Sequence, residues 1–277
     1  MVTENQRAKA QRFLELHTGG RLLVLPNAWD AGSARIFEQA GFHALGTTSA
    51  GVALSLGYPD GERVSRADML EVVRRIASAV AIPVTADLEA GYGPTVNDVV
   101  ETAKGAIAAG AVGMNFEDST SDDRLVDVAV NVERIRAVKK VAEAEGIAFV
   151  LNARTDVFLL QIGESAGRFD ETVRRANAYR AAGADCLFVP GVTDAETIGR
   201  LVRAIKGPMN VLAGRGTPPT GELERLGVAR VSIGGGPMRA ALTLTLRIAQ
   251  ELAERGTYTS FTENALPLRD FNRLFER

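Results

Sequence analysis

The pattern of hydrophobic and polar residues along this chain switches repeatedly between two forms, one typical of strands and one typical of helices. Short apolar runs rich in β-prone residues are separated by longer stretches whose apolar residues recur at helical spacing. This alternation is typical of β/α units that build a parallel sheet. Eight strands are predicted, at residues 22–26, 44–48, 83–87, 112–116, 148–152, 185–189, 209–213 and 230–233.

The helical stretches between these runs have recognisable ends. Four of them are followed directly by a glycine, at Gly41, Gly110, Gly146 and Gly183. Glycine is the usual residue just past a helix, because it adopts positive φ at little cost. Helices are predicted at residues 30–40, 66–80, 97–109, 132–145, 171–182 and 237–254.

Eight β/α units without a linker or low-complexity segment predict one (β/α)₈ TIM-type barrel over residues 1–277. The polar, amphipathic residues 1–16 form an N-terminal helix that would close the barrel bottom. The alternative is a doubly wound sheet, which is weaker because no GxGxxG follows the first strand, where residues 25–29 read Leu-Pro-Asn-Ala-Trp.

The C-terminal residues 256–277 are predicted to form a helical extension of this barrel. Phe271, Leu274 and Phe275 would lie on one face of its last helix. Such a face needs a partner, so we expect the extension to pack on a neighbouring subunit of a homo-oligomer.

Composition narrows the class of protein and its partners. Hydrophobic residues make up 46% and charged residues 24%, as in an ordinary soluble globular protein. A net charge of −2 without a basic run provides no surface for nucleic acid, and no apolar stretch is long enough to span a membrane. The single cysteine, Cys186, and the absence of a signal-peptide pattern lead us to expect a cytoplasmic protein.

Polar residues collect where the predicted strands end, which is where the active sites of such barrels lie. Asp87 and Glu89 stand at i and i+2 as the third strand runs into a glycine-rich turn, so both should point to one side. Two like charges held close together are costly unless a cation or a shared proton relieves them. Carboxylate oxygens suit Mg²⁺ or Mn²⁺ better than Zn²⁺. These two acids therefore predict a metal site.

Asp60 and Glu117 are expected to complete a mostly water-mediated Mg²⁺ site with Asp87 and Glu89. Such an ion would bind the carboxylate and keto oxygens of a 2-oxo acid and stabilise an enolate. The alternative is that these acids cap helices or pair with arginines at the barrel mouth. Asp60, in a Tyr-Pro-Asp-Gly sequence, would by itself be only a turn residue.

Arg154 follows the fifth strand, so its guanidinium should reach the barrel mouth and bind a carboxylate or phosphonate with two hydrogen bonds. Alternatively it forms a structural ion pair with Glu117 or Asp156. Small side chains, hydroxyls and backbone N–H groups in residues 46–51 can cradle an anionic group, although small residues occur in any tight loop. The binding candidates in this segment are Thr48, Ser49, Ala50 and Gly51.

Other conspicuous residues are interpreted as structural. The run at 234–237 is read as a turn rather than a phosphate site, because no Ser, Thr or Lys flanks it. His17 and His43 would lie at the wrong end of the barrel for catalysis, and Cys186 reads as a buried small apolar residue. Mechanisms that need a histidine base or a cysteine acid at the mouth are therefore disfavoured.

Over about residues 20–255 the chain resembles the isocitrate lyase/phosphoenolpyruvate mutase superfamily. The matching residues are Ser55 to Asp60, the sequence Asp87-x-Glu89-x-Gly91-Tyr92-Gly93, Glu117-Asp118, and Ala153 to Asp156. The resemblance implies a (β/α)₈ barrel that is a tetramer or dimer with exchanged C-terminal helices. It also implies Mg²⁺-assisted making or breaking of C–C or P–C bonds in 2-oxo acids.

The resemblance also implies roles for single residues. Asp87, Glu89 and Glu117 would belong to the metal site, with Asp60 beside it. Arg154 and the turn Thr48 to Ala50 would hold the substrate carboxylate. The expected catalytic residues are Asp60, Glu117 and Arg154.

This chain departs from the superfamily in the residues that select the reaction. The loop 119–126 has no cysteine, lysine or histidine, so the lyase signature and the phosphonomutase gating segment are both absent. Cleavage of isocitrate or methylisocitrate is therefore not expected. Residues 189–191 read Val-Pro-Gly and residues 213–215 read Ala-Gly-Arg, where relatives place other polar groups. Arg124 and Arg215 are the obvious replacements.

Three functions compete on this basis. The first is an Mg²⁺-dependent lyase, decarboxylase or hydrolase that acts on a 2-oxo acid such as oxaloacetate or phosphonopyruvate. The second is a non-catalytic 2-oxo-acid-binding protein of the same superfamily, motivated by the loop without an evident acid or base. The third, a purely structural barrel, is disfavoured by the four carboxylates and the arginine at the mouth.

Overall fold

The computed structural model describes residues 2–120, 122–263 and 265–276. Its centre is one parallel sheet of nine strands in the order β1-β9-β8-β7-β6-β5-β4-β3-β2. The strands are β1 (Leu23–Leu25), β2 (Asn27–Ala28), β3 (Leu45–Thr47), β4 (Val84–Asp87), β5 (Gly113–Glu117), β6 (Val150–Arg154), β7 (Cys186–Val189), β8 (Met209–Leu212) and β9 (Arg230–Ser232).

The sheet closes into a barrel through its first strand, which is split in two at Pro26. Leu23 in β1 pairs with Arg230 in β9, whereas Asn27 in β2 pairs with Gly46 in β3. Proline has no N–H and cannot donate to a neighbouring strand, which explains the break. All eight predicted strands are present and the barrel is confirmed. The doubly wound alternative is wrong, because the strand order never reverses.

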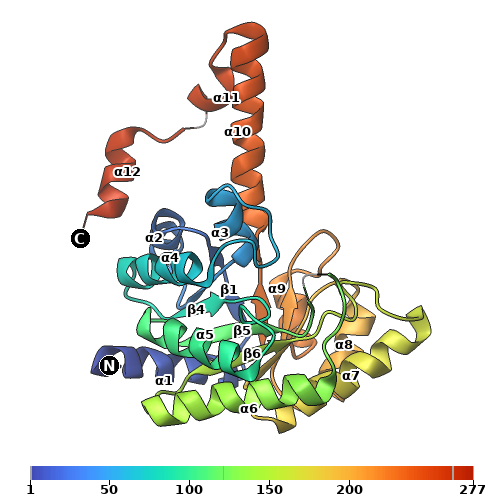
Figure 1. The fold of residues 1–277 in the computed structure, drawn as a ribbon. Helices are drawn as coiled ribbons and strands as arrows, with labels where there is room; N and C mark the ends of the chain where they lie inside the picture. Colours follow the sequence, from blue (N-terminus) through green and yellow to red (C-terminus); the bar gives the residue numbers. More distant parts are fainter. Residues whose placement is uncertain (1, 121, 264, 277) are drawn as a thin grey trace.

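Helices follow the strands and surround the barrel (Figure 1). None of the described helices is long and apolar enough to cross a membrane. The helices are α1 (Glu4–Thr18), α2 (Ala31–Gln39), α3 (Ser49–Ser55), α4 (Arg66–Ala79), α5 (Val96–Ala108), α6 (Val128–Glu145), α7 (Ser165–Ala181), α8 (Ala195–Ala204), α9 (Thr220–Arg225), α10 (Gly236–Arg255), α11 (Thr259–Thr262) and α12 (Leu268–Phe275).

The sequence pattern missed three of these helices and two helix starts. The pattern does not predict α3, α8 or α9, while α6 begins at Val128 rather than at residue 132 and α7 begins at Ser165 rather than at residue 171. For α8 a signal existed, because Asp194 caps its first turn and Ile198 and Leu201 are fully buried at helical spacing. The helices α3 and α9 are too short for a clear period.

The helix α1 closes the bottom of the barrel, as expected (Figure 1). Its Phe13 is fully buried, and its Gln6 side-chain amide donates to the backbone oxygens of Ile107 and Ala111 at 2.8 and 3.1 Å. A Cβ at Gly113 would lie 3.2 Å from the Phe13 ring and 2.5 Å from the Val150 oxygen. Glycine at this position therefore lets the phenyl ring reach the barrel floor.

The C-terminal helices form an arm that extends from the barrel mouth (Figure 1). The Glu251 carboxylate fixes the turn after α10, because it accepts hydrogen bonds from the backbone N–H of Thr259 at 2.8 Å and of Ser260 at 2.7 Å. The chain then returns to α2, where Arg35 Nη2 donates to the Glu276 oxygen at 3.1 Å. Phe271 and Phe275 remain partly exposed.

We propose that this arm completes an interface between copies of the chain. Leu242 and Leu246 lie on one side of α10 and Leu244 lies on the opposite side, and these three residues and Leu252 are exposed. A helix with leucines exposed on more than one side is usually covered by partners.

The double substitution Leu244→Glu/Leu246→Glu is expected to shift the particle mass toward the 29.5 kDa monomer, because it places charge on both sides of the helix. Light scattering coupled to size exclusion measures this mass. Gln250→Glu, an exposed polar position of the same helix, is the control. A mass that the double substitution leaves unchanged would contradict the proposal.

Candidate active site

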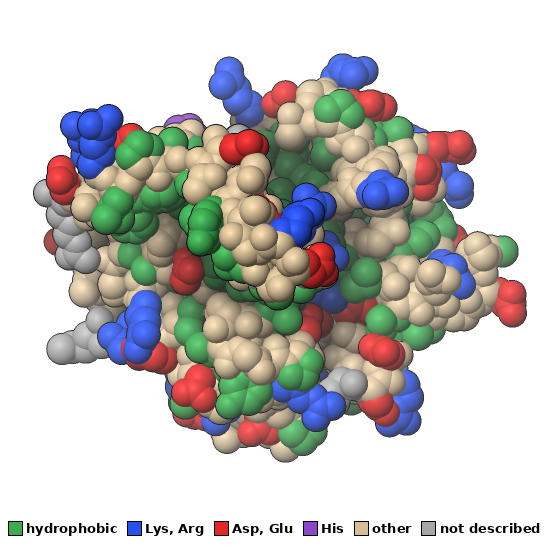
Figure 2. All heavy atoms as spheres, turned by 90° about the horizontal axis from the view of Figure 1, so that it is seen from above, with side chains coloured by type: hydrophobic (Ala, Val, Ile, Leu, Met, Phe, Trp, Pro, Cys, Tyr) green, Lys and Arg blue, Asp and Glu red, His purple; other side chains and the backbone are tan. Residues whose placement is uncertain are grey.

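A cavity of about 320 Å³ opens at the carboxyl ends of the strands, on the face seen in Figure 2. Loops after β4, β5 and β6 and the segment between α3 and α4 supply its walls. The structure therefore brings together acids that are far apart in the sequence. The lining residues are Ser49, Asp60, Gly61, Glu62, Glu89, Ala90, Glu117, Ser119, Thr120, Asp123, Arg154, Asp156, Leu159 and Leu160.

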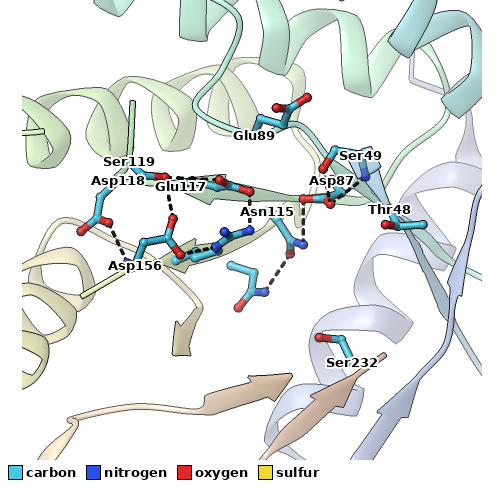
Figure 3. A network of polar contacts seen from close by, with 12 residues as sticks. Thr48, Ser49, Asp87, Glu89, Asn115, Glu117, Asp118, Ser119, Asp156 and Ser232 are labelled. Atoms are coloured by element: carbon cyan, nitrogen blue, oxygen red, sulfur yellow. Dashed lines mark hydrogen bonds and ion pairs between the residues drawn. The ribbon is translucent and has the colours of Figure 1, made fainter. Parts of the chain in front are cut away.

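Asp87 is the last residue of β4, and three donors hold its carboxylate (Figure 3). Its Oδ2 accepts from the backbone N–H of Ser49 at 2.8 Å and from the Ser49 hydroxyl at 3.0 Å. Its Oδ1 accepts from the Asn115 side-chain amide at 3.2 Å. Donors on both oxygens fix the plane of the carboxylate.

Glu89 does not follow the strand alternation that was expected to place it beside Asp87. The strand ends at Asp87, and Glu89 has a left-handed backbone with φ +50°. Figure 3 shows the Glu89 carboxylate turned away from that of Asp87. It accepts instead from the backbone N–H of Glu62 and from the Tyr92 hydroxyl at 3.1 Å. The expectation that the side chains of Asp87 and Glu89 point to the same place is therefore wrong.

Arg154 lies between two acids at the end of β6. Its Nη1 pairs with Glu117 Oε1, and its Nε pairs with Asp156 Oδ1 at 2.6 Å. The Ser119 hydroxyl donates to the other Asp156 oxygen at 2.6 Å. The structural ion pair foreseen as an alternative is thus present, and 17% of the Arg154 side chain remains exposed to the cavity. Contact of Arg154 with a ligand stays a prediction.

The segment Thr48 to Gly51 is the first turn of a helix rather than the tight loop that was expected. Thr48 caps α3, and its hydroxyl accepts from the Gly51 N–H at 3.3 Å. The Ser49 N–H is already bonded to Asp87. Two N–H groups that the prediction left free for a substrate are therefore engaged within the chain. Ser49 lines the cavity, whereas Thr48, Ala50 and Gly51 are not among its lining residues.

Negative charge outweighs positive charge in this cavity. Arg154 is the one basic residue among the described lining residues, against six acids. Burial and the charges of Asp60 and Asp87 raise the pKa of Glu89 to about 7. Burial and then the charge of Asp87 raise the pKa of Asp60. Burial, reinforced by Asp156, Asp87 and Glu89 and opposed by Arg154, raises the pKa of Glu117 well above its usual value.

This donor set fits a hard divalent cation, because oxygen ligands and unbalanced negative charge favour Mg²⁺ or Mn²⁺. Within residues 2–120, 122–263 and 265–276, no three carboxylate, imidazole or thiol groups are close enough to hold an ion by themselves. An ion in this cavity would therefore be held directly by few of these side chains, and waters would complete its coordination. Asp87, Glu89 and Glu117 are the residues that would hold it.

The raised pKa of Glu89 predicts a pH dependence for metal binding and stability. The pKa of a glutamate in the unfolded chain is about 4.3, whereas that of Glu89 in the folded protein is about 7. Protonated Glu89 therefore stabilises the fold fully below pH of about 4.3, and this stability is lost as the pH rises through about 7. A cation binds the deprotonated carboxylate and replaces the lost stability. Mn²⁺ should therefore raise the melting temperature more at about pH 8 than at about pH 5.5. Thermal denaturation with and without Mn²⁺ measures this, and equal shifts at the two pH values would contradict it.

Residues interpreted as structural from the sequence occupy structural places. Cys186 is fully buried, and buried His17 contacts the Phe13 oxygen at 2.8 Å. In the run 234–237, Gly234 and Gly235 make a turn and residues 236–237 begin α10; Gly234 has φ +51°, and its N–H donates to Asn27 Oδ1 at 2.8 Å. His43 is exposed. No phosphate role is needed to explain these groups.

The two arginines considered as replacements in the altered loops do not line the cavity. Arg124 pairs with Asp122 at 2.5 Å, and its side chain is 79% exposed. Arg215 is exposed in the loop after β8. In this structure neither arginine adds positive charge to the site.

Asn115 is a site residue that the sequence reasoning missed. It joins Asp87 to the barrel interior, since its side-chain oxygen accepts from Asn152 at 2.8 Å. The signal was a single amide within the apolar strand Gly113–Glu117, two residues before the acid Glu117. In a strand this spacing places both side chains on the same side.

Comparison with known proteins gives a consistent picture. The family model of phosphoenolpyruvate phosphomutase matches residues 13–253. An uncharacterized protein of Mycobacterium tuberculosis is 35% identical over 242 residues, which cover 87% of this chain and 89% of that protein. An oxaloacetate decarboxylase of Rhodopseudomonas palustris is 32% identical over 235 residues, which cover 81% and 78%.

Two solved structures add to this comparison. A Burkholderia cenocepacia J2315 protein, described only by class as a lyase or mutase, has a TM-score of 0.92 and 43% identity, and the match covers 99% of this chain and 98% of that one. A phosphonopyruvate hydrolase in complex with oxalate and Mg²⁺ has a TM-score of 0.84 and 26% identity, with coverage of 96% and 94%.

Proposed function

Since the chain belongs to the isocitrate lyase/phosphoenolpyruvate mutase superfamily, we propose that it is an Mg²⁺-dependent enzyme acting on a small 2-oxo acid. It breaks a C–C or P–C bond of the carbon next to the keto group, so that an enolate forms, as in decarboxylation of oxaloacetate or hydrolysis of phosphonopyruvate. Mn²⁺ would serve in place of Mg²⁺, because both prefer oxygen ligands.

The observation that carries this proposal is the acid-rich cavity at the barrel mouth with Arg154 at its floor. When bound, the ion would polarise the keto oxygen and stabilise negative charge on it. The chain's own groups then have separate tasks. Asp87, Glu89 and Glu117 hold the ion, and the exposed part of Arg154 binds the substrate carboxylate.

Ser119 provides a group that can hold a proton beside the reacting atoms. Its hydroxyl donates to Asp156 at 2.6 Å and lies 3.5 Å from a Glu117 oxygen. Asp60 also lines the cavity, and burial together with the charge of Asp87 raises its pKa, which favours a protonated carboxyl that can give up a proton. These two residues are our candidates for proton transfer to the leaving enolate.

The relatives support the class of substrate. One relative is named as an oxaloacetate decarboxylase, and a structural neighbour is a phosphonopyruvate hydrolase with bound oxalate and Mg²⁺. A 2-methylisocitrate lyase of Escherichia coli is also 29% identical. We do not propose that activity, because the described residues of the loop 119–126 include no cysteine, lysine or histidine.

The test is product release from a panel of small 2-oxo acids that includes oxaloacetate and phosphonopyruvate. Pyruvate is followed by reduction to lactate, with Mg²⁺ and after its removal by a chelator. The proposal expects turnover of at least one compound that stops on chelation and returns with Mg²⁺. No metal-dependent turnover of any compound would overturn it.

A non-catalytic 2-oxo-acid-binding protein is the second candidate. It is favoured by one observation, since no histidine, cysteine or lysine is among the described residues that line the cavity. This candidate expects calorimetric binding of 2-oxoglutarate that depends on Mg²⁺ and is not followed by turnover. Absence of binding heat with Mg²⁺ present would count against it.

A further inference from the structure

A positive charge is buried in the barrel interior beneath the acids of the site. Arg230 is the first residue of β9, and its side chain is the largest fully buried one among the described residues. Burial lowers its pKa to about 10. Its Nη2 donates to Asn115 Oδ1 at 3.3 Å, while its Nε and Nη1 have no acceptor among the described residues. A buried guanidinium without a carboxylate partner costs stability.

Among the described residues, the one hydrogen bond of the Arg230 side chain is to Asn115, which also contacts an acid of the site. Asn115 Oδ1 accepts from both Arg230 and Asn152, at 3.3 and 2.8 Å. The amide nitrogen of Asn115 is then the only side-chain atom left to face Asp87, to which it donates at 3.2 Å (Figure 3). The chain of contacts therefore runs from a buried cation, through one amide, to an acid of the site.

An arginine suits this position because its guanidinium has donors only and stays charged. An asparagine amide can be turned by half a rotation, which exchanges its donor and its acceptor. Arg230 and Asn152 both donate to Oδ1 of Asn115. If the Asn115 amide were reversed, its NH₂ group would face these two donors and no hydrogen bond could form. The reversed amide would also point its oxygen at the Asp87 carboxylate.

We propose that Arg230 is a positioning residue for Asp87, acting through Asn115. By fixing the Asn115 amide it keeps one donor on Asp87 Oδ1 while Ser49 holds Oδ2, so the carboxylate keeps the orientation in which it binds a divalent cation. The inference rests on the proposed function, because it takes Asp87 as a ligand of that cation. A packing role alone would not connect Arg230 to metal affinity.

The test compares Mn²⁺ affinity with stability in Arg230→Met, which has similar volume and no charge. Without metal, the melting temperature should stay the same or rise, because replacing an unpaired buried charge by an apolar side chain is neutral or stabilising. Mn²⁺ affinity measured by calorimetry should fall about tenfold, as is typical when a group behind a metal ligand is lost. A packing role predicts the opposite pattern, with lower stability and unchanged affinity.

A double-mutant cycle tests whether the effect passes through Asn115. In an Asn115→Ala background, Arg230→Met should have no further effect on Mn²⁺ affinity, because the connecting amide is gone. The matched control is Ser232→Ala, a buried hydroxyl of the same strand that is bonded to Asn210 rather than to Asn115. Its Mn²⁺ affinity should equal that of the wild type.

The proposal is overturned if the Arg230→Met variant binds Mn²⁺ as tightly as the wild type. It is also overturned if Arg230→Met lowers Mn²⁺ affinity by the same factor in the wild-type protein and in the Asn115→Ala variant. If this variant does not fold, Arg230→Lys and Arg230→Gln replace it, because lysine can only donate whereas glutamine can also accept. Tighter Mn²⁺ binding by the lysine variant is then expected, and equal affinity refutes the proposal. A wild type that binds no Mn²⁺ would instead overturn the proposed function itself.

Discussion

Asp87→Ala is expected to abolish detectable Mg²⁺ or Mn²⁺ binding and to lower kcat/KM by at least about 1,000-fold. A metal acting as a Lewis acid contributes several kcal/mol to the transition state, and each 1.4 kcal/mol or so is a factor of about ten in rate. Asp87 is the acid whose two oxygens are held by three donors, so it is the best fixed of the ligands we propose. Calorimetry with Mn²⁺ and the pyruvate assay measure the two losses.

The control for this substitution is Glu62→Gln. Glu62 lines the cavity at the barrel mouth, whereas Asp87 is not among its lining residues, and the Glu62 carboxylate accepts from the Tyr92 N–H at 2.8 Å, a hydrogen bond that glutamine can also accept. We expect its kcat/KM to stay within about tenfold of the wild type, since it removes charge but no ligand. Equal losses in the two variants would show that overall charge, rather than a bond to Asp87, controls the site.

Arg154→Met is expected to lower both activity and the free energy of unfolding. Its guanidinium is ion-paired with Glu117 and Asp156, of which Asp156 is fully buried. Removing one partner of a buried ion pair leaves an uncompensated charge and typically costs about 3–5 kcal/mol. Burial alone would lower the pKa of Arg154, but Glu117 and Asp156 outweigh it and raise that pKa, so the group stays charged. Urea denaturation measures the loss.

A second substitution separates charge from packing at Arg154. In the double variant Arg154→Met/Glu117→Gln, part of the lost stability should return, because one of the unpaired acids is gone. Arg124→Met is the surface control. Arg124 pairs with Asp122 at a side-chain exposure of 79%, so its removal should change stability by less than about 1 kcal/mol. A loss at Arg124 as large as that at Arg154 would contradict this explanation.

The barrel could be predicted because its strands are marked locally. Each is a short apolar run, and the run at Val84–Asp87 is followed by a turn rich in glycine. The helix α3 could not be predicted in the same way. It begins with small residues after Thr48, and the hydrogen bond that the Gly51 N–H donates to the Thr48 hydroxyl marks the helix start only in the structure. Small residues at a strand end therefore predict a loop and a helix start equally well.

Asp87 and Glu117 could be singled out from the sequence because each ends a strand, but the direction of Glu89 could not. The alternation rule holds only within a strand, and the left-handed backbone of Glu89 ends it. Asn115 and Arg230 were out of reach for another reason. They meet across the barrel at 115 positions of separation, so their contact depends on barrel closure rather than on any local spacing.

Titration with oxalate tests the central claim most directly. Oxalate carries two adjacent oxygens like those of a 2-oxo acid enolate, and it occupies the related phosphonopyruvate hydrolase together with Mg²⁺. We predict that oxalate binds this protein in calorimetry when Mg²⁺ is present, that binding is lost on chelation, and that Asp87→Ala does not bind it in either condition. Equal binding of oxalate with and without Mg²⁺, or undiminished binding by Asp87→Ala, would contradict the metal-dependent site at the barrel mouth.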